Sequence, residues 1–238
     1  MTDSLSALVK ASIDGWAERL RAHSPLVRAA QQGELSQRSL ALYLESLRYV
    51  FAQSQANILG AAERAQALQL PELAAYFRDK AREETGHDQW AANDLLHLPS
   101  LAVEGIRPAA ASLELVSLQD ALIQKHPMCF LAYTVWAEYL TASLGDEWLR
   151  MLARSGYQRS AVSAVALHLE ADQDHALEGF EALDRLWPNV ARVEGAPSAL
   201  EILDGVLCAE QGFEAFCAEI CEASQAAAVG DVRSSLPT

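Results

Sequence analysis

Apolar side chains recur every three or four residues along most of the chain, which is the period of an amphipathic α-helix. Near the N-terminus this apolar set is Leu5, Leu8, Ile13, Trp16 and Leu20. Prolines, glycines and capping serines divide the pattern into segments. These signals predict helices over approximately residues 4–22, 26–32, 36–68, 71–96, 112–125, 128–144, 147–154, 159–186 and 198–227.

No stretch alternates apolar and polar residues as a strand would, and no tandem repeat is present. The pattern therefore predicts an all-α protein, a single compact bundle of about eight helices over residues 1–228. The irregular stretch 97–109 is long enough to cross one end of the bundle. Residues 229–238 are expected to form a disordered tail.

The composition of the chain argues against some classes of function. The net charge of −14 disfavours binding to nucleic acid or to anionic lipid, because both carry negative charge. No run approaches the roughly 20 apolar residues of a membrane-spanning helix, and the N-terminus lacks a signal-peptide pattern. The four cysteines form no CxxC pair. A reduced, cytoplasmic protein is expected.

The stretch from Arg82 to Trp90 holds the first candidate site. Glu83 and Glu84 stand four and three residues before His87, and on a helix these offsets place side chains on one face. A helix of this kind can bind a metal ion. Taken alone, the same residues also fit a solvated, charged helix surface.

The helix predicted over residues 128–144 is strongly apolar and carries one acidic residue, Glu138. An ionised carboxylate in an apolar core costs several kcal/mol unless it is paired or bound to a metal. Glu138 therefore requires a partner from another helix.

The helix predicted over residues 159–186 carries His168, Asp172 and His175 at intervals of four and three residues, which is the step of one helical face. Small residues continue this face on both sides, ending at Gly179, so we expect the face to point inward. A hydrogen-bonded pair of His168 and Asp172 at the surface is the alternative.

These three helices would offer imidazole and carboxylate groups to a common interior. Such a mixed set suits iron or manganese better than zinc, which prefers sulfur and nitrogen, or magnesium, which prefers oxygen. Two metal ions sharing carboxylates inside a helix bundle fit the number of candidates.

Two parts of the sequence resemble a known superfamily. The segments from His23 to Gly33 and from Leu40 to Leu47 resemble the N-terminal signature of the haem-oxygenase-like superfamily, which includes thiaminase-II proteins and pyrroloquinoline-quinone synthase. The order of Glu83-Glu84-x-Gly86-His87-Asp88, then Glu138, then His168-x-x-x-Asp172 resembles its branch of diiron oxidases and oxygenases. The resemblance covers roughly residues 20–225.

The resemblance implies a ligand set drawn from three helices. Its members would be Glu84, His87, Glu138, His168 and Asp172, with Glu83 as an alternative to Glu84. The family usually takes a further carboxylate from its first long helix, but residues 46–51 contain no acid. Either Glu45 serves, or the second metal is held weakly, or His175 completes the site.

The function that the resemblance implies is oxidation of a small organic substrate by O2. Two Fe(II) ions, or one held firmly, would activate O2, and the substrate would be an amino acid, an amine or a fatty acid. The resemblance also implies a homodimer. Four aromatic residues are expected to lie near the site: Tyr49, Tyr133, Trp136 and Tyr139.

Three alternative functions fit parts of the sequence. A metal-independent hydrolase like thiaminase II would use Cys129, or Cys208 with Glu210. A haem-binding protein would use His23 as its axial ligand, although a helix end is a poor place for one. A purely structural bundle is the third alternative.

Overall fold

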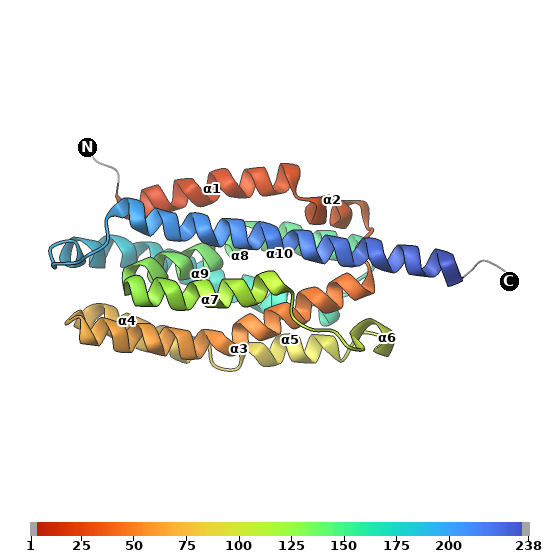
Figure 1. Cartoon of the computed structure of the whole chain (residues 1–238), viewed down its shortest axis with the longest axis horizontal. Helices are drawn as coiled ribbons and strands as arrows, with labels where there is room; N and C mark the ends of the chain where they lie inside the picture. The colour runs from red at the N-terminus through yellow and green to blue at the C-terminus, as the bar shows by residue number, and fades with distance from the viewer. Residues whose placement is uncertain (1–3, 235–238) are drawn as a thin grey trace.

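A computed structural model of the chain describes residues 4–234, with the side chains of residues 4–223. Ten α-helices and one short 3-10 helix account for the regular structure of these residues, and no β-strand occurs among them. The long helices run roughly parallel to the longest axis of the molecule (Figure 1). The predicted all-α bundle is confirmed.

The helices are named α1 to α10 in chain order, and η1 is the 3-10 helix. Their bounds are α1 Leu5–His23, α2 Pro25–Gln32, α3 Gln37–Ala67, α4 Pro71–Glu83, α5 His87–Leu95, α6 Ser100–Val103, α7 Ala110–Lys125, α8 Pro127–Arg154, η1 Arg159–Ala161, α9 Ser163–Val190 and α10 Ala199–Ser234.

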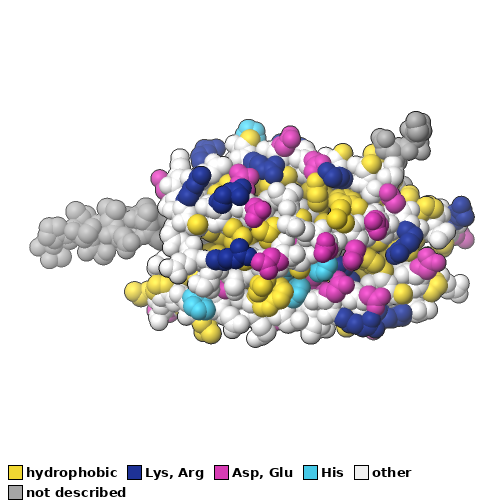
Figure 2. Space-filling view, turned by 180° about the vertical axis from the view of Figure 1, so that it is seen from behind, with side chains coloured by type: hydrophobic (Ala, Val, Ile, Leu, Met, Phe, Trp, Pro, Cys, Tyr) yellow, Lys and Arg dark blue, Asp and Glu magenta, His cyan; other side chains and the backbone are white. Residues whose placement is uncertain are grey.

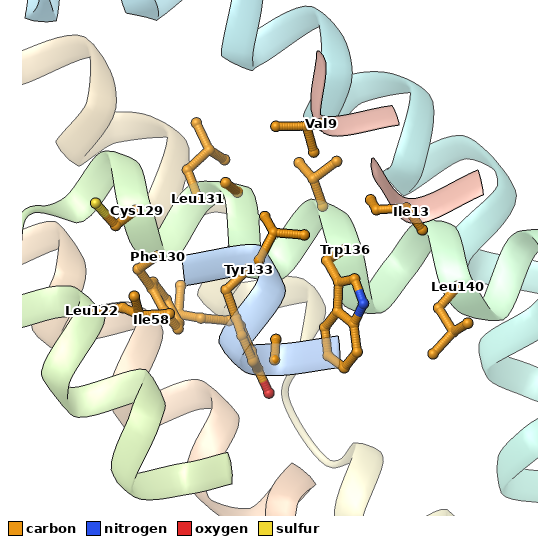
Figure 3. Close-up of a cluster of buried hydrophobic side chains, with 14 of the residues drawn as sticks. Val9, Ile13, Ile58, Leu122, Cys129, Phe130, Leu131, Tyr133, Trp136 and Leu140 are labelled. Atoms are coloured by element: carbon orange, nitrogen blue, oxygen red, sulfur yellow. The ribbon is translucent and has the colours of Figure 1, made fainter. Parts of the chain in front are cut away.

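Helix α8 forms the centre of the bundle, as its apolar sequence predicts. All of its first ten residues are buried, because apolar side chains point in nearly every direction around it. In Figure 3, Val9 and Ile13 of α1 lie against one side of α8. Ile58 of α3 and Leu122 of α7 lie at the end near Phe130.

The helix predicted over residues 71–96 is broken in the structure. Helix α4 ends at Glu83 and α5 begins at His87, and between them Gly86 adopts a left-handed backbone with φ of 86°. Only glycine adopts this conformation without a steric cost. His87 is thus the first residue of a new helix.

The break predicted at Gly145 is wrong, because α8 continues through it to Arg154. Gly145 instead marks a close contact between helices: a Cβ atom there would lie 2.8 Å from Leu169 Cδ1 of α9. Gly179 has the same role on α9, where a Cβ would lie 2.6 Å from Val135 Cγ2. These two glycines allow α8 and α9 to pack closely along their lengths.

Smaller differences concern helix ends. The stretch 97–109 contains the short helix α6, and α9 starts later and ends later than predicted. Helix α10 runs on to Ser234, beyond the predicted start of the tail. Residues 235–238 of that tail lie outside the described residues.

The surface carries charges of both signs. On the face opposite to that of Figure 1, acidic and basic side chains are interspersed with apolar ones (Figure 2). In residues 4–234, no helix combines the length and apolar character that crossing a membrane requires.

Glu210 of α10 is buried against α1 with 2% of its surface exposed, and Ser12 Oγ donates a 3.3 Å hydrogen bond to its Oε1. Burial raises the pKa of Glu210 from 4.5 to about 7, although the Ser12 bond opposes this. As the pH rises, Glu210 therefore loses its proton near pH 4.5 in the unfolded chain but only near pH 7 in the folded protein. Stability should fall as pH rises across this window.

We expect Glu210→Gln to be more stable than the wild type above about pH 7, by at most about 3 kcal/mol, and to gain little near pH 4.5. Thermal unfolding of both proteins across this pH range measures the effect. Glu222→Gln, which changes an exposed residue of the same helix, is the control. An identical pH profile for Glu210→Gln and the wild type would contradict the prediction.

Candidate metal centre

Three potential ligands meet where α5 begins and α9 passes it. One ligand atom each from Glu84, His87 and His168 lies within 4.8 Å of the other two. Both histidines are buried, and Glu84 is largely so. In the described part of the chain, no other group of three or more such side chains is this close.

Glu84 and His87 are brought together by the turn between α4 and α5. Glu84 Oε2 lies 3.3 Å from His87 Nδ1. The ring of His87 stacks on Trp90, one turn further along α5, with 4.1 Å between ring centroids. The aromatic face of Trp90 therefore limits the orientations open to the His87 ring.

His168 is held by its own helix. Its Nδ1 lies 2.8 Å from the Ala164 carbonyl oxygen, which can only accept a hydrogen bond, so Nδ1 carries the proton. Nε2 is then left with a free lone pair, and it is buried without a hydrogen-bond partner among the described residues. A hydrogen-bonded Nδ1 and an unpartnered Nε2 are typical of a metal-binding histidine.

Asp94 of α5 fixes the position of α9. This fully buried carboxylate accepts a hydrogen bond from Ser163 Oγ and a 2.8 Å bond from the Ala164 backbone N–H. These groups belong to the first turn of α9, whose N–H groups have no partners within the helix. Asp94 thus ties the helix of His87 to the helix of His168.

The surroundings of these residues favour the protonation states that bind metals. Burial lowers the pKa of His168, so its ring is neutral at pH 7. Burial alone would raise the pKa of Glu84, but the close contact with His87 and the charges around it hold that pKa below its usual value. The site therefore combines a neutral imidazole with an ionised carboxylate.

A second polar group lies next to the first, around the ammonium of Lys80 on α4. Lys80 is 3% exposed, and its Nζ lies 2.8 Å from Glu83 Oε2 and 3.1 Å from Glu138 Oε1. His175 Nε2 lies 3.5 Å from Glu83 Oε2, and His175 Nδ1 lies 3.7 Å from Asp172 Oδ1. Lys80 is thus the partner that Glu138 requires.

The charges of this second group are strongly coupled. Burial raises the pKa of Glu138 to about 7, and the nearby Asp172 adds to this while Lys80 opposes it. Burial would lower the pKa of Lys80, but the carboxylates of Glu138 and Glu83 raise it. Lys80 is therefore a fixed positive charge.

The predicted ligands thus fall into two groups. Glu84, His87 and His168 form the first. In the second, Glu138 and Glu83 pair with Lys80, and His175 lies beside Glu83 and Asp172. Glu45 belongs to neither: its carboxylate forms two 2.7 Å bonds to Arg48, and it does not line the pocket described below.

On α3, Phe51 takes the place beside the site where an acid was expected. Its ring stacks on His168 with 4.2 Å between centroids.

Four residues of the site were not singled out in the sequence: Phe51, Lys80, Trp90 and Asp94. Lys80 had a signal, because Lys80, Glu84 and His87 follow the same four-then-three spacing as His168, Asp172 and His175. Aromatic residues and a capping aspartate give no such signal, since they are common on helices.

A cavity of about 260 Å³ adjoins the two groups. Apolar side chains of α1, α2, α3, α8 and α10 form most of its wall. The polar site residues that line it are Lys80, Glu84, Glu138, His168 and Asp172. A molecule in this cavity would lie in an apolar space with these polar groups at its wall.

Of the aromatic residues expected near the site, Tyr133 and Trp136 line the cavity, and Figure 3 shows both extending from the same side of α8. Tyr49 and Tyr139 are not among the lining residues, and the Tyr139 hydroxyl donates a hydrogen bond to Asp14 instead. The ring of Trp136 also packs against the rings of Trp16 and Phe213.

The cysteines are poorly placed for a thiaminase-like reaction. Burial raises the pKa of Cys129 to about 11, and Cys129 does not line the cavity. Cys208 is exposed whereas Glu210 is buried, so they do not face one another. Cys217 does line the cavity, but burial raises its pKa to about 12. The proposed haem ligand His23 is exposed at the end of α1 and does not line the cavity.

The first group has the composition of a known class of metal centre. Two histidines and one carboxylate that leave other coordination positions open are typical of non-haem Fe(II) oxygenases. The unpartnered, buried Nε2 of His168 and the close carboxylate of Glu84 fit such an ion. These residues therefore fit iron.

Comparison with solved structures identifies the fold. A domain of unknown function with a haem-oxygenase-like fold, from Shewanella denitrificans OS217, matches with a TM-score of 0.72 and 17% identity, over 99% of this chain and 97% of that one. The chain has a haem-oxygenase-like fold. This confirms the fold that the segments from His23 to Gly33 and from Leu40 to Leu47 indicated.

A CADD-like protein of unknown function from Nostoc punctiforme PCC 73102 shares the haem-oxygenase-like arrangement of this chain. It matches with a TM-score of 0.64 and 14% identity, over 92% of this chain and 99% of that one. A second crystal structure of the same protein gives a TM-score of 0.52. No protein-family model and no curated protein matches the chain. At these identities the haem-oxygenase-like fold is shared, and the chemistry rests on the site itself.

Proposed function

We propose that this protein is a non-haem iron oxidase or oxygenase that uses O2 to oxidise a small organic substrate. The observation that carries the proposal is the group of Glu84, His87 and His168, which offers two imidazoles and one carboxylate within 4.8 Å. The resemblance to haem-oxygenase-like diiron oxidases and oxygenases supports it from the sequence.

The residues around the group have separate tasks. Bound ferrous iron supplies the capacity to activate O2. His168 offers Nε2 because Ala164 holds its Nδ1, and Phe51 and Trp90 cover its ring. Glu138 has a pKa raised by burial to about 7 and lines the cavity, so it can hold or release a proton there near neutral pH.

The lining of the cavity favours a substrate that is largely apolar. Its wall is built mainly from leucine, valine and aromatic side chains, and a volume of about 260 Å³ suits a small molecule or a short hydrocarbon chain. Among the expected substrates, a fatty acid or an apolar amine fits this wall better than a polar amino acid.

Anaerobic loading with Fe(II), followed by addition of O2, tests the proposal. We expect purified, metal-free protein to bind Fe(II), and we expect the absorption spectrum to change when O2 is added. Consumption of O2 should increase when fatty acids or amines are supplied. Failure to bind Fe(II), or binding unaffected by the loss of His87 and of His168, would exclude the proposed function.

A further inference from the structure

The second polar group has the layout of a cation site that is already filled by a side chain. Lys80 enters from α4, one helical turn before Glu84, so the two side chains lie on the same face. Its ammonium lies 3.1 Å from Glu138 and 2.8 Å from Glu83, and His175 lies next to Glu83 and Asp172. These groups are oxygen and nitrogen donors arranged around one positive charge.

Two segments that carry polar residues run past one another in opposite order. One segment carries Lys80, Glu84 and His87, from α4 across the turn at Gly86 to the start of α5. The other segment is α9, which carries His168, Asp172 and His175. Glu84, His87 and His168 meet at one end of this contact. At the other end Lys80 and His175 meet through the shared carboxylate of Glu83. The end with Glu84, His87 and His168 has no basic side chain of lysine or arginine in its group, whereas the end with Glu83 and His175 contains Lys80.

We infer that the Lys80 ammonium takes the position of a second metal ion, so that the centre holds one metal ion per chain. This inference rests on the proposed iron-binding function. It differs from the two ions that the sequence resemblance implies.

Energetics argue that Lys80 stays in this position. A buried ammonium is stable only when carboxylates compensate its loss of hydration, and Glu138 and Glu83 provide that compensation at hydrogen-bonding distance. A divalent ion among the same carboxylates would have to approach their oxygens to about 2.1 Å and would repel the ammonium. One cation therefore excludes the other.

The carboxylates themselves remain suitable for a metal once the lysine is removed. Glu138 Oε2 is buried without a hydrogen-bond partner in the described part of the chain, and His175 Nδ1 is in the same situation. With Asp172 and Glu83 nearby, these donors form a mixed set like that of the first group. Removal of the ammonium should leave an excess of negative charge that attracts a second ion.

Titration of metal-free protein with Fe(II) or Mn(II) under anaerobic conditions, read by calorimetry and by metal analysis after desalting, tests the inference. We expect one ion per wild-type chain and two ions per chain in Lys80→Met. Lys80→Arg, which retains the charge, and Lys10→Met, which removes an exposed lysine paired with Asp14, should both stay at one. Lys80→Gln serves as a second neutral variant if Lys80→Met does not fold.

The outcomes separate the two proposals. Two ions in the wild type would overturn the inference and leave the iron-binding function intact. One ion in the wild type and one in the folded neutral variants would also overturn it, because the position would then not be a cation site. No metal in the wild type would instead overturn the proposed function.

Discussion

His168→Ala is expected to lower the affinity for Fe(II) by roughly 100-fold or more, because it removes one of three ligands, and even the loss of residues behind a ligand costs 10- to 100-fold. The variant should fold, since the Asp94 bonds that hold α9 to α5 involve Ser163 and Ala164 and not His168. Anaerobic titration with Fe(II) measures the affinity, and circular dichroism checks the helix content.

His97→Ala is the matched control. His97 is an exposed histidine just beyond α5, and its Nδ1 lies 2.9 Å from the Asn93 carbonyl oxygen, so it has the same type of local bond as His168. We expect its affinity for Fe(II) to equal that of the wild type. Equal affinity in His168→Ala would show that the metal does not bind at this group.

Glu138→Leu is expected to destabilise the metal-free protein by roughly 3 kcal/mol, because it leaves the buried ammonium of Lys80 with Glu83 as its remaining close carboxylate. Removal of both charges in Lys80→Met/Glu138→Leu should restore stability to near the wild-type value, since an apolar pair can replace a buried ion pair. Unfolding in urea with a chelator present measures both.

The control for this pair is Glu45→Leu. Glu45 also forms an ion pair with a basic side chain, that of Arg48. The Arg48 side chain is 37% exposed, so it stays hydrated when the carboxylate is lost. The expected cost is about 1 kcal/mol or less. A loss in Glu138→Leu no larger than in Glu45→Leu, or a double variant as unstable as the single one, would contradict this account of Lys80.

The helical pattern, and the helices that carry the candidate ligands, could be predicted from the sequence because apolar periodicity and inward-facing polar residues are local features. Glu138 was recognisable because a lone acid in an apolar helix needs a partner. The spacing of Lys80, Glu84 and His87 alone did not identify that partner, since a lysine on a helix is ordinarily exposed. Only packing reveals that Lys80 is buried.

The glycines show a second reason why sequence reasoning fell short. Gly86 lies at a break between two helices and Gly145 does not, although both are single glycines in helical sequence. Gly86 takes a left-handed backbone, whereas Gly145 provides space for Leu169 of a neighbouring helix. Which role a glycine has depends on the neighbour that it meets, and that neighbour is distant in the sequence.

The two hydrogen bonds from Asp94 to the start of α9 have a consequence for how the centre would assemble. They hold α5 against α9 through groups other than the ligands, so the spacing of His87 and His168 is set by the chain itself. The conformational entropy of the ligand side chains is then lost when the protein folds and not when the metal binds. A preorganised centre of this kind can exchange its metal without refolding, and its fixed geometry contributes to selectivity together with its donor atoms.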